Sequence, residues 1–290
     1  MYNEISANKR KTWILITIFT IVILLLGWTL GASAGDASAG IILATIISVV
    51  MTLVSYYSGD SIALAASGAK QIQKEQAPEL WNLIENLAMS AGLPMPKVYV
   101  INDSSPNAFA TGRDPQHASV AVTTGLVERL ERVELEGVLA HELSHIKNYD
   151  IRVMTIVVVL VGVVLLLSDW ILRGFFFRDR DSGGGQAAMV LFLVGLVLAI
   201  LSPIFAELIK LAVSRQREYL ADATGALMTR YPEGLARALE KIAEQDQPLK
   251  QANHATAHLF LANPFDPHVT KKFEQLFSTH PPIMERVARL

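Results

Sequence analysis

Two histidines and a glutamate are spaced for metal chemistry within LAHELSHIKN, at residues 139–148. Residues four apart on an α-helix share a face, so His141 and His145 can direct their imidazole rings at one metal ion. Glu142 is rotated by about 100° from His141, so it can reach a water molecule on that ion without being a ligand. This spacing is the H-E-x-x-H pattern of zinc metalloproteases.

The chemistry that this pattern predicts is the hydrolysis of a peptide bond. Zinc lowers the pKa of a bound water towards about 7 and polarises the scissile carbonyl. Glu142 would take the proton of the water and later give it to the leaving amine. The chain has no cysteine, which excludes disulfides and thiolate ligands. We therefore expect one zinc ion per chain, held by histidine nitrogens and carboxylate oxygens.

A catalytic zinc site needs a third protein ligand. The long metzincin pattern would require glycine at position 148 and histidine at position 151, where this chain has Asn148 and Ile151. The stretch SRQREYLADATGA, residues 214–226, supplies Glu218 and, one turn later, Asp222. We interpret Glu218 as the third ligand and Asp222 as the acceptor of the outer N–H of a ligating histidine. The alternative is that Glu218 only pairs with a neighbouring arginine on a solvated helix face.

A second histidine pair has the same spacing but lacks a base. His254 and His258 lie in HATAH, which has no glutamate after the first histidine and sits in a loop-like stretch. Because hydrolysis needs a base, we interpret this pair as a surface feature. His117 and His268 belong to no ligand pattern.

Four apolar blocks indicate a membrane protein. The chain is 51% hydrophobic and 18% charged, which is apolar for a soluble protein. Each block is close to the ~20 residues that span a bilayer. The blocks are residues 13–30, 40–57, 154–172 and 187–205. We therefore expect a multi-pass membrane protein.

These blocks divide the chain into four regions. We expect residues 1–58 to form an N-terminal transmembrane hairpin and residues 154–213 to form a second transmembrane pair. Residues 59–153, with the HELSH helix, and residues 214–290, with the third ligand, are then two halves of one catalytic part. Because both halves share one site, the second pair either crosses the membrane twice or forms a hairpin that never fully crosses.

Positive charges set the expected orientation. Lys9, Arg10 and Lys11 precede the first block, whereas residues 32–39 carry no positive charge. The positive-inside rule therefore places the N-terminus and both catalytic halves in the cytoplasm. The same charges, with small residues after the block, also resemble a signal peptide. The apolar run is longer than a typical signal core and a second block follows at once, so we interpret it as an uncleaved anchor.

Two glycines in the first block, Gly27 and Gly31, have the spacing of a small-residue helix-pairing motif. Small residues are common in all spanning helices. We therefore interpret this spacing as composition rather than as a specific contact.

The soluble regions alternate helical and strand patterns, which indicates an α+β fold that is predominantly helical with a small β-sheet. Apolar residues at helical spacing predict an amphipathic helix over residues 70–92. Residues 97–103 and 118–125 have the composition of strands, and residues 106–112 are typical of a turn followed by a short extended piece. From Arg132 the pattern turns helical and runs into the HELSH motif.

Several motifs in one order give the chain a family resemblance. They are HELSH after a transmembrane hairpin, a second apolar pair, REYLADATGA, and STHPPIMERVARL at the C-terminus. Together they resemble the HtpX-type membrane zinc metalloproteases, which belong with the prenyl-protein (CAAX) protease and the mitochondrial quality-control protease Oma. The resemblance covers essentially the whole chain. It implies a gluzincin-like domain in which His141, His145 and Glu218 bind zinc and Glu142 is the base.

The resemblance also implies where substrate binds. Asn107, Ala108, Phe109 and Ala110, within PNAFATGR, match the substrate edge of the family. Such an edge holds an extended substrate as an added strand through main-chain hydrogen bonds. Asn107 would contact the substrate backbone.

Two C-terminal residues are further candidates. His280, in STHPP, is similar to a histidine that the wider group places near the zinc. It would donate a hydrogen bond to the developing oxyanion, or it only positions the Pro281–Pro282 turn. Arg286 would anchor a buried carboxylate.

The function that the resemblance implies is that of a bacterial inner-membrane endopeptidase with its N-terminus and site facing the cytoplasm. It would degrade misfolded or damaged membrane proteins, so its partners are unfolded protein chains and the lipid bilayer. The net charge of −2 gives no indication of a nucleic-acid partner. A CAAX-type processor is an alternative, although that relative encloses its site within more than four spans. A scaffold with a structural metal is another, although a structural zinc would not need Glu142.

Overall fold

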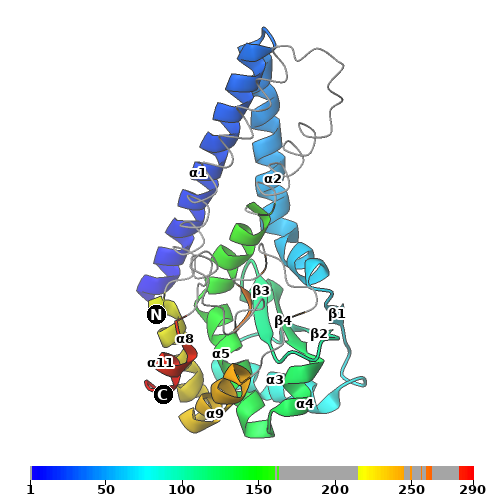
Figure 1. The fold of residues 1–290 in the computed structure, drawn as a ribbon, viewed down its shortest axis with the longest axis vertical. Coiled ribbons are helices and arrows are strands. Elements are labelled where there is room, and N and C mark those ends of the chain that lie inside the picture. Colours follow the sequence, from blue (N-terminus) through cyan, green and yellow to red (C-terminus); the bar gives the residue numbers. More distant parts are fainter. Residues whose placement is uncertain are drawn as a thin grey trace.

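A computed structural model of the chain describes residues 2–160, 162, 215–244, 249, 256, 259–262 and 281–290. Two long helices extend from a body that holds a four-stranded sheet and shorter helices (Figure 1). The expected class, α+β and predominantly helical with a small sheet, is confirmed. The expected second transmembrane pair, apart from residues 154–160 and 162, lies outside the described residues.

The two long helices, α1 (Tyr2–Ser33) and α2 (Ala37–Ala66), form a hairpin (Figure 1). Among the described residues, Ser6–Ala32 and Ala37–Ala66 are long and apolar enough to cross a membrane. At 1.5 Å per residue, these 27 and 30 residues measure about 40 Å and about 45 Å. Both exceed the ~30 Å of hydrocarbon in a bilayer. The expected spans, residues 13–30 and 40–57, lie inside these helices, which continue beyond them.

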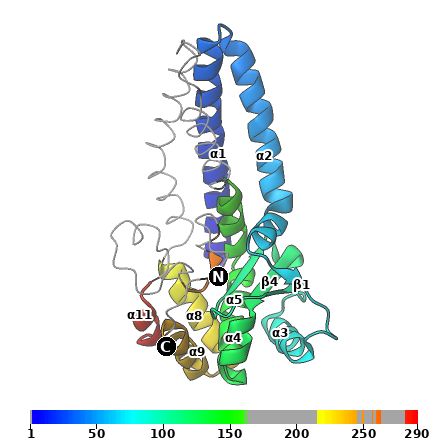
Figure 2. The same cartoon turned by 45° about the vertical axis from the view of Figure 1, so that its right-hand side comes forward.

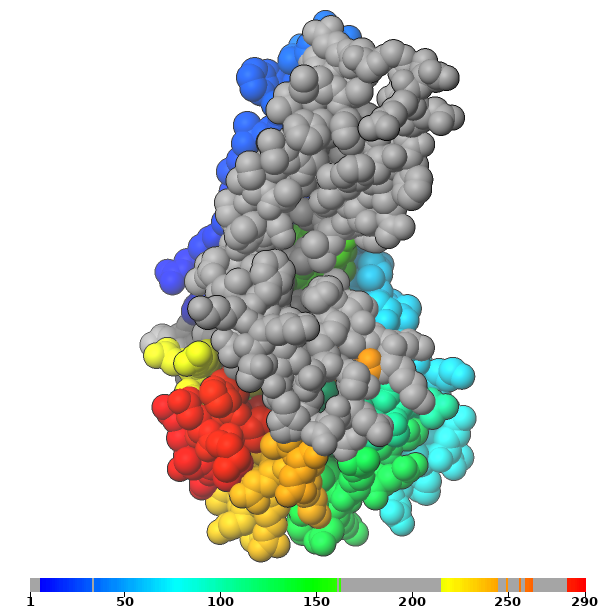
Figure 3. Space-filling model, in the orientation of Figure 1, coloured from blue at the N-terminus to red at the C-terminus, as the bar shows by residue number. Residues whose placement is uncertain are grey.

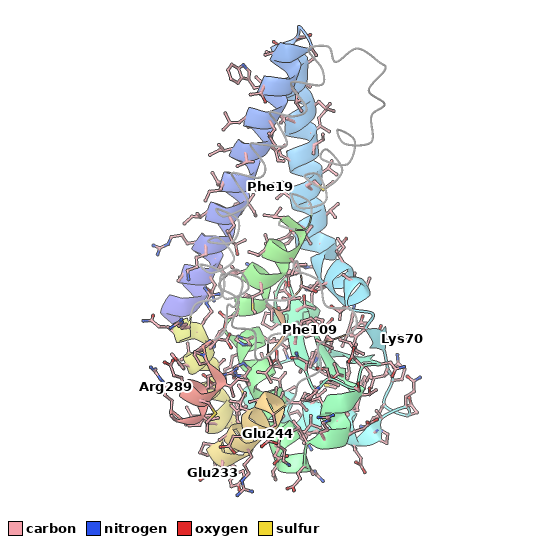
Figure 4. The ribbon with its side chains drawn as sticks, in the orientation of Figure 1. Phe19, Lys70, Phe109, Glu233, Glu244 and Arg289 are labelled. Carbon is pink, nitrogen blue, oxygen red and sulfur yellow. The ribbon has the colours of Figure 1, made fainter. Side chains whose placement is uncertain are left out.

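Large apolar side chains cover the outside of the hairpin. Trp13, Ile42 and Leu43 are 69%, 62% and 60% exposed, whereas Phe19 points inward and is buried (Figure 4). An apolar surface of this extent is unfavourable in water and favourable in lipid. Trp13 and Trp28 lie near opposite ends of the expected span, residues 13–30, where aromatic side chains meet the membrane interfaces.

The tip of the hairpin is closed by glycine contacts. A Cβ on Gly27 would lie 2.6 Å from the carbonyl oxygen of Gly40, and one on Gly31 would lie 2.8 Å from the Cα of Gly40. The two backbones therefore approach closely, with the small methyl group of Ala44 beside Gly27 at this contact. The interpretation of this glycine spacing as composition alone is wrong, because both glycines lie at a close contact between α1 and α2.

The sheet has the strand order β1-β2-β4-β3. β2 (Lys97–Ile101) and β4 (Ala118–Thr123) are parallel, while β3 (Ala108–Gly112) pairs antiparallel with β4 and lies at the edge. The short β1 (Lys70–Gln71) pairs antiparallel with β2 at the other edge. The expected strands are present with shorter bounds.

At two boundaries the observed elements differ from those expected from the sequence. The helix expected over residues 70–92 is only α3 (Pro78–Ala91), because the chain first forms β1 and a turn, and Pro78 then occupies the first helical position. The expected second strand stops at Thr123, whose side chain accepts a hydrogen bond from the Leu126 N–H at 3.2 Å. That hydrogen bond caps α4 (Thr124–Arg129).

The helix α5 (Arg132–Lys147) lies at the centre of the body and begins where the sequence predicts. Its N-terminus is closed by a capping box in which Glu134 accepts from the Glu131 N–H at 2.8 Å. The same carboxylate receives the ammonium group of Lys241 at 2.7 Å. Lys241 belongs to α9 (Pro232–Ala243), so one side chain both starts α5 and ties it to its neighbour.

Two further helices complete the body around α5. α8 (Arg215–Thr229) packs against α5, and α11 (Ile283–Val287) packs on α9. Figure 2 shows α8, α9 and α11 together on one side of α5, with α3 on the other. In Figure 3, α11 (red) adjoins α9 at the lower end of the molecule.

A sharp turn separates α5 from the next helical run. α5 ends at Asn148, and Tyr149 has a φ of 61°, a left-handed conformation that breaks the helix. A new helical run then covers residues 150–160, and its buried side chains share one apolar core with the lower half of α1. Figure 1 shows this run at the base of the hairpin. The helical run that follows α5 is therefore packed against the two long helices.

The glycine contact predicts a position-specific effect on stability. Gly27→Leu places a side chain where the backbone of α2 lies, so we expect the detergent-purified protein to lose about 1–3 kcal/mol of stability. Thr29→Leu adds the same side chain on the exposed face of the same helix and should leave stability nearly unchanged. Thermal unfolding in detergent measures both. Equal melting temperatures for the two variants would contradict the contact.

Candidate metal centre

The three expected ligands meet in the interior. His141 and His145 of α5 bring their Nε2 atoms to 3.1 Å from each other. Glu218 of α8 places one carboxylate oxygen 3.7 Å from His141 Nε2 and the other 3.6 Å from His145 Nε2. All three side chains are buried, and their ligand atoms lie within 4.8 Å of one another. The solvated pairing of Glu218 with a neighbouring arginine, the alternative from sequence, does not describe this geometry.

The outer nitrogen of each histidine contacts a carboxylate. Asp222 Oδ1 lies 2.9 Å from His141 Nδ1, which is the role expected of Asp222. Asp150 Oδ2 lies 3.1 Å from His145 Nδ1. When each Nδ1–H donates outward, both Nε2 lone pairs face the Glu218 carboxylate. Two imidazole nitrogens and one carboxylate oxygen around a single point fit a zinc ion.

Asp150 is the residue of this centre that the sequence interpretation missed. Asp150 follows His145 by five residues, a spacing that does not share a face in a continuous helix. The left-handed conformation of Tyr149 turns the chain back and brings Asp150 beside His145. The only signal in the sequence is a carboxylate shortly after the motif, which by itself is common.

Arg286 anchors a buried carboxylate, as the sequence suggested. Its Nη2 and Nε donate to the two oxygens of Asp222 at 2.7 Å and 3.0 Å. The same Nη2 is 3.4 Å from both ring nitrogens of His141, which places it over the imidazole face rather than in line with either lone pair. A fully buried guanidinium of this kind fixes the plane of Asp222 and therefore that of His141.

Neighbouring charges, hydrogen bonds and burial determine the protonation states of Asp222 and His141. Burial raises the pKa of Asp222, but hydrogen bonds from His141 and Arg286 outweigh burial and hold the pKa at about 2. Burial and the Arg286 charge lower the pKa of His141 to about 4. Asp222 is therefore an anion and His141 a neutral imidazole at physiological pH.

The pKa of His145 is shifted upward, opposite to that of His141. Burial lowers its pKa, but the hydrogen bond to Asp150 and the charges of Glu218, Asp150 and Glu142 outweigh burial and raise the pKa to about 9. In the metal-free protein at neutral pH, His145 therefore carries a proton on Nε2 and directs it at His141 and Glu218.

Glu142 is a buried carboxyl that lies between the two histidines on α5. Burial raises the pKa of its carboxyl to about 7, and the Glu218 charge adds to this, while His145 and Arg286 oppose it. The carboxylate also accepts a hydrogen bond from the Ala110 backbone N–H of β3. A carboxyl whose pKa lies near 7 can both take and return a proton at neutral pH.

A glycine lets α8 reach α5. A Cβ on Gly225 would lie 3.0 Å from the backbone nitrogen of His141 and 3.2 Å from its Cα. Because the two helix backbones lie this close together, Glu218 and Asp222, which come earlier on α8, can reach the histidines of α5. Any larger residue at position 225 would push the two ligand-bearing helices apart.

The expected substrate edge is paired with another part of the chain. The Asn107 carbonyl accepts from the Thr123 N–H of β4, so the Ala108 carbonyl points to the free side of β3. There it accepts a hydrogen bond from the Leu261 N–H at 3.0 Å. The side-chain amide of Asn107 makes two hydrogen bonds with the backbone of Ala262. Its Nδ2 donates to the Ala262 carbonyl at 3.0 Å, and its Oδ1 accepts from the Ala262 N–H at 3.2 Å.

An aromatic contact continues this pairing. Phe109 and Phe260 stack edge to face with ring centroids 5.0 Å apart. Phe109 lies in the interior of the body, below the hairpin (Figure 4). Residues 259–262 therefore lie along β3 next to the metal centre, and Arg286 Nη1 is 3.4 Å from the Leu261 carbonyl.

The remaining candidate histidines take no described part in the centre. His117 pairs with Asp114 at 2.6 Å at the surface, in the 3-10 turn Pro115–His117. His280, His254, His258 and His268 lie outside the described residues.

The protonation of His145 predicts how metal affinity depends on pH. Zinc must displace the proton on Nε2, so affinity should rise about tenfold per pH unit as the pH approaches about 9. Chelator competition at several pH values measures this. Asp150→Asn removes a charge that raises the pKa of His145, so the pH range over which zinc affinity increases should move to lower pH. An affinity independent of pH in both proteins would show that His145 is already neutral.

Comparisons with known proteins agree with this geometry. The sequence profile of peptidase family M48 matches residues 74–290. The protease HtpX homologue of Dictyoglomus thermophilum is 47% identical over 293 residues, which cover 100% of this chain and 93% of that protein. The protease HtpX homologue of Tropheryma whipplei (strain Twist) is 46% identical, with 100% and 97% coverage.

A solved structure shares the fold. The crystal structure of Ste24p from S. mikatae superposes with a TM-score of 0.52 at 20% sequence identity, covering 100% of this chain and 66% of that one. At this identity the likeness concerns the fold alone. The sequence matches are far closer and extend over the whole chain. The chain therefore belongs to peptidase family M48, as a membrane zinc metalloprotease of the HtpX group.

Proposed function

We propose that this metalloprotease is an endopeptidase that cleaves misfolded or damaged membrane proteins in a bacterial inner membrane, with one zinc ion per chain. The observation that carries the proposal is the position of Glu142, whose pKa of about 7 suits a base and which adjoins both the ligands and β3. A structural metal site needs no such carboxyl, which disfavours a scaffold.

The residues of the centre would divide the chemistry as follows. His141, His145 and Glu218 hold the zinc, which when bound supplies a Lewis acid that polarises the scissile carbonyl and acidifies a water. Glu142 takes the proton of the attacking water and returns it to the leaving amine. Asp222, held flat by Arg286, keeps His141 in the tautomer that presents Nε2 inward.

Substrate would bind along β3 as an added strand. The Ala108 carbonyl faces the free side of this edge strand, and the neighbouring Asn107 amide offers a donor and an acceptor to a passing backbone. Residues 259–262 use these same groups. We infer that a substrate backbone would make similar hydrogen bonds in their place. Such a site requires extended chain, which folded proteins do not offer and unfolded proteins do.

His280 remains a proposed donor to the oxyanion. Its support is its place in the sequence, directly before Pro281 and the short helix α11. That helix carries Arg286 into the metal centre. A donor near this point would stabilise the negative charge that develops on the carbonyl oxygen.

The proposed location is the cytoplasmic side of the membrane. Lys9, Arg10 and Lys11 lie at the end of α1 that adjoins the body, and the loop at the opposite end carries no positive charge. The positive-inside rule then places the body, with its metal centre, in the cytoplasm. A protease tethered there would meet the cytoplasmic segments of membrane proteins.

Two substitutions test the roles of Glu142 and Glu218. Glu142→Gln should keep zinc and lose at least about 10²-fold in kcat on an unfolded protein, because no group takes the proton. Glu218→Ala should lose zinc affinity as well, because a ligand is missing. Purified full-length protein in detergent, with metal content measured in the same samples, checks both. Cleavage by Glu142→Gln at the wild-type rate would contradict the assignment.

A third substitution tests the substrate edge. Phe260→Ala removes the aromatic contact that holds residues 259–262 on β3, a contact worth about 0.5–1.5 kcal/mol. If substrate competes for this edge, KM should fall about two- to tenfold while kcat holds. Met284→Ala, an exposed position on α11, is the control. An unchanged or higher KM for Phe260→Ala would place substrate elsewhere.

A further inference from the structure

The first helix carries an asparagine that is buried among charged neighbours. Asn8 is 1% exposed, whereas Lys9 and Arg10 beside it are exposed. Asn8 lies one turn before Trp13, at the end of α1 that adjoins the body. A buried amide in this position requires partners, since a polar side chain without them destabilises a protein.

The partners of Asn8 are in the turn that follows the metal-binding helix. Its Nδ2 donates to Asp150 Oδ1 at 2.7 Å and to the Asn148 carbonyl at 2.9 Å. The first of these hydrogen bonds is charge-assisted and therefore among the stronger kinds. α1 thus contacts a carboxylate that is remote from it in sequence by 142 residues.

The same carboxylate holds a zinc ligand. Asp150 Oδ2 faces His145 Nδ1 at 3.1 Å, while Oδ1 faces Asn8 and lies 3.4 Å from Arg217 Nε of α8. Asp150 is 1% exposed, so its orientation is set by these protein groups rather than by water. Three elements, α1, α8 and the turn after α5, meet at this one side chain.

We propose that Asn8 is a positioning residue of the zinc centre. By donating to Oδ1, it turns the Asp150 carboxylate so that Oδ2 accepts from His145 Nδ1, and this fixes the ring plane and tautomer of the ligand. The start of the membrane helix α1 is then part of the catalytic unit. Zinc is held tightly only when α1 is docked on the body.

Two substitutions of Asn8 separate positioning from packing. Asn8→Ala removes the donor, and Asn8→Asp keeps the shape but sets a second carboxylate against Asp150. Groups that orient a zinc ligand contribute about 10–100-fold to metal affinity. We therefore expect Asn8→Ala to weaken zinc binding by about tenfold, and Asn8→Asp to weaken it at least as much. Ser6→Ala, an exposed position on the same helix, should have no effect.

The measurement is zinc affinity by chelator competition on the full chain in detergent, which does not depend on proteolysis. Wild-type affinity in Asn8→Ala would overturn the proposal. So would near-normal affinity in Asn8→Asp beside a loss in Asn8→Ala, because shape alone would then suffice.

A double-mutant cycle distinguishes an effect of Asn8 through Asp150 from a general loss of folding. Asp150→Ala removes the group through which Asn8 acts, so adding Asn8→Ala to it should weaken zinc binding no further. Thermal unfolding of each metal-free protein reports stability separately. If the two substitutions weaken zinc binding by independent, multiplying factors, Asn8 does not act through Asp150 and the proposal fails.

Discussion

The burial of a highly charged cluster is the constraint on which the rest of the structure depends. Four carboxylates, two imidazoles and two guanidiniums lie together in the interior of the body. An ion in such surroundings is stable only when it is paired and hydrogen-bonded. The pairing is specific: Asp222 lies between Arg286 and His141, and Asp150 lies between Asn8 and His145. The ligand atoms of His141, His145 and Glu218 lie close to one another, and together with the carboxyl of Glu142 they are the groups available for catalysis.

Meeting this constraint requires elements from the whole length of the chain. α5 supplies the two histidines and the base, α8 the third ligand and Asp222, α11 the arginine, and α1 the asparagine. Close helix contacts make this possible, since Gly225 lets the α8 backbone approach that of His141. The hairpin also contacts the metal centre, because Asn8 near the start of α1 donates to the Asp150 carboxylate that lies beside His145.

The edge strand β3 connects the metal centre with residues 259–262. Its outward groups point to two places at once: the Ala110 N–H reaches Glu142, and the Ala108 carbonyl reaches residues 259–262. An edge strand of this kind exposes unpaired backbone groups, which pair readily with any extended chain. Residues 259–262 cover that edge and keep it from unselective pairing. In the proposed mode of substrate binding, a chain that competes for this edge must itself be extended.

The sequence by itself determined the chemistry and the main elements. Because helical spacing fixes which side chains share a face, it placed His141, Glu142 and His145 together, and it identified Glu218 and Asp222 one turn apart. Hydropathy located the first two spans. Only the tertiary structure decided the contacts of Asp150 with His145 and Asn8, the glycine contact at the tip of the hairpin, and the occupation of β3 by residues 259–262. The physical reason is that these contacts join residues across a helix break or over a hundred positions apart, where no periodicity relates them.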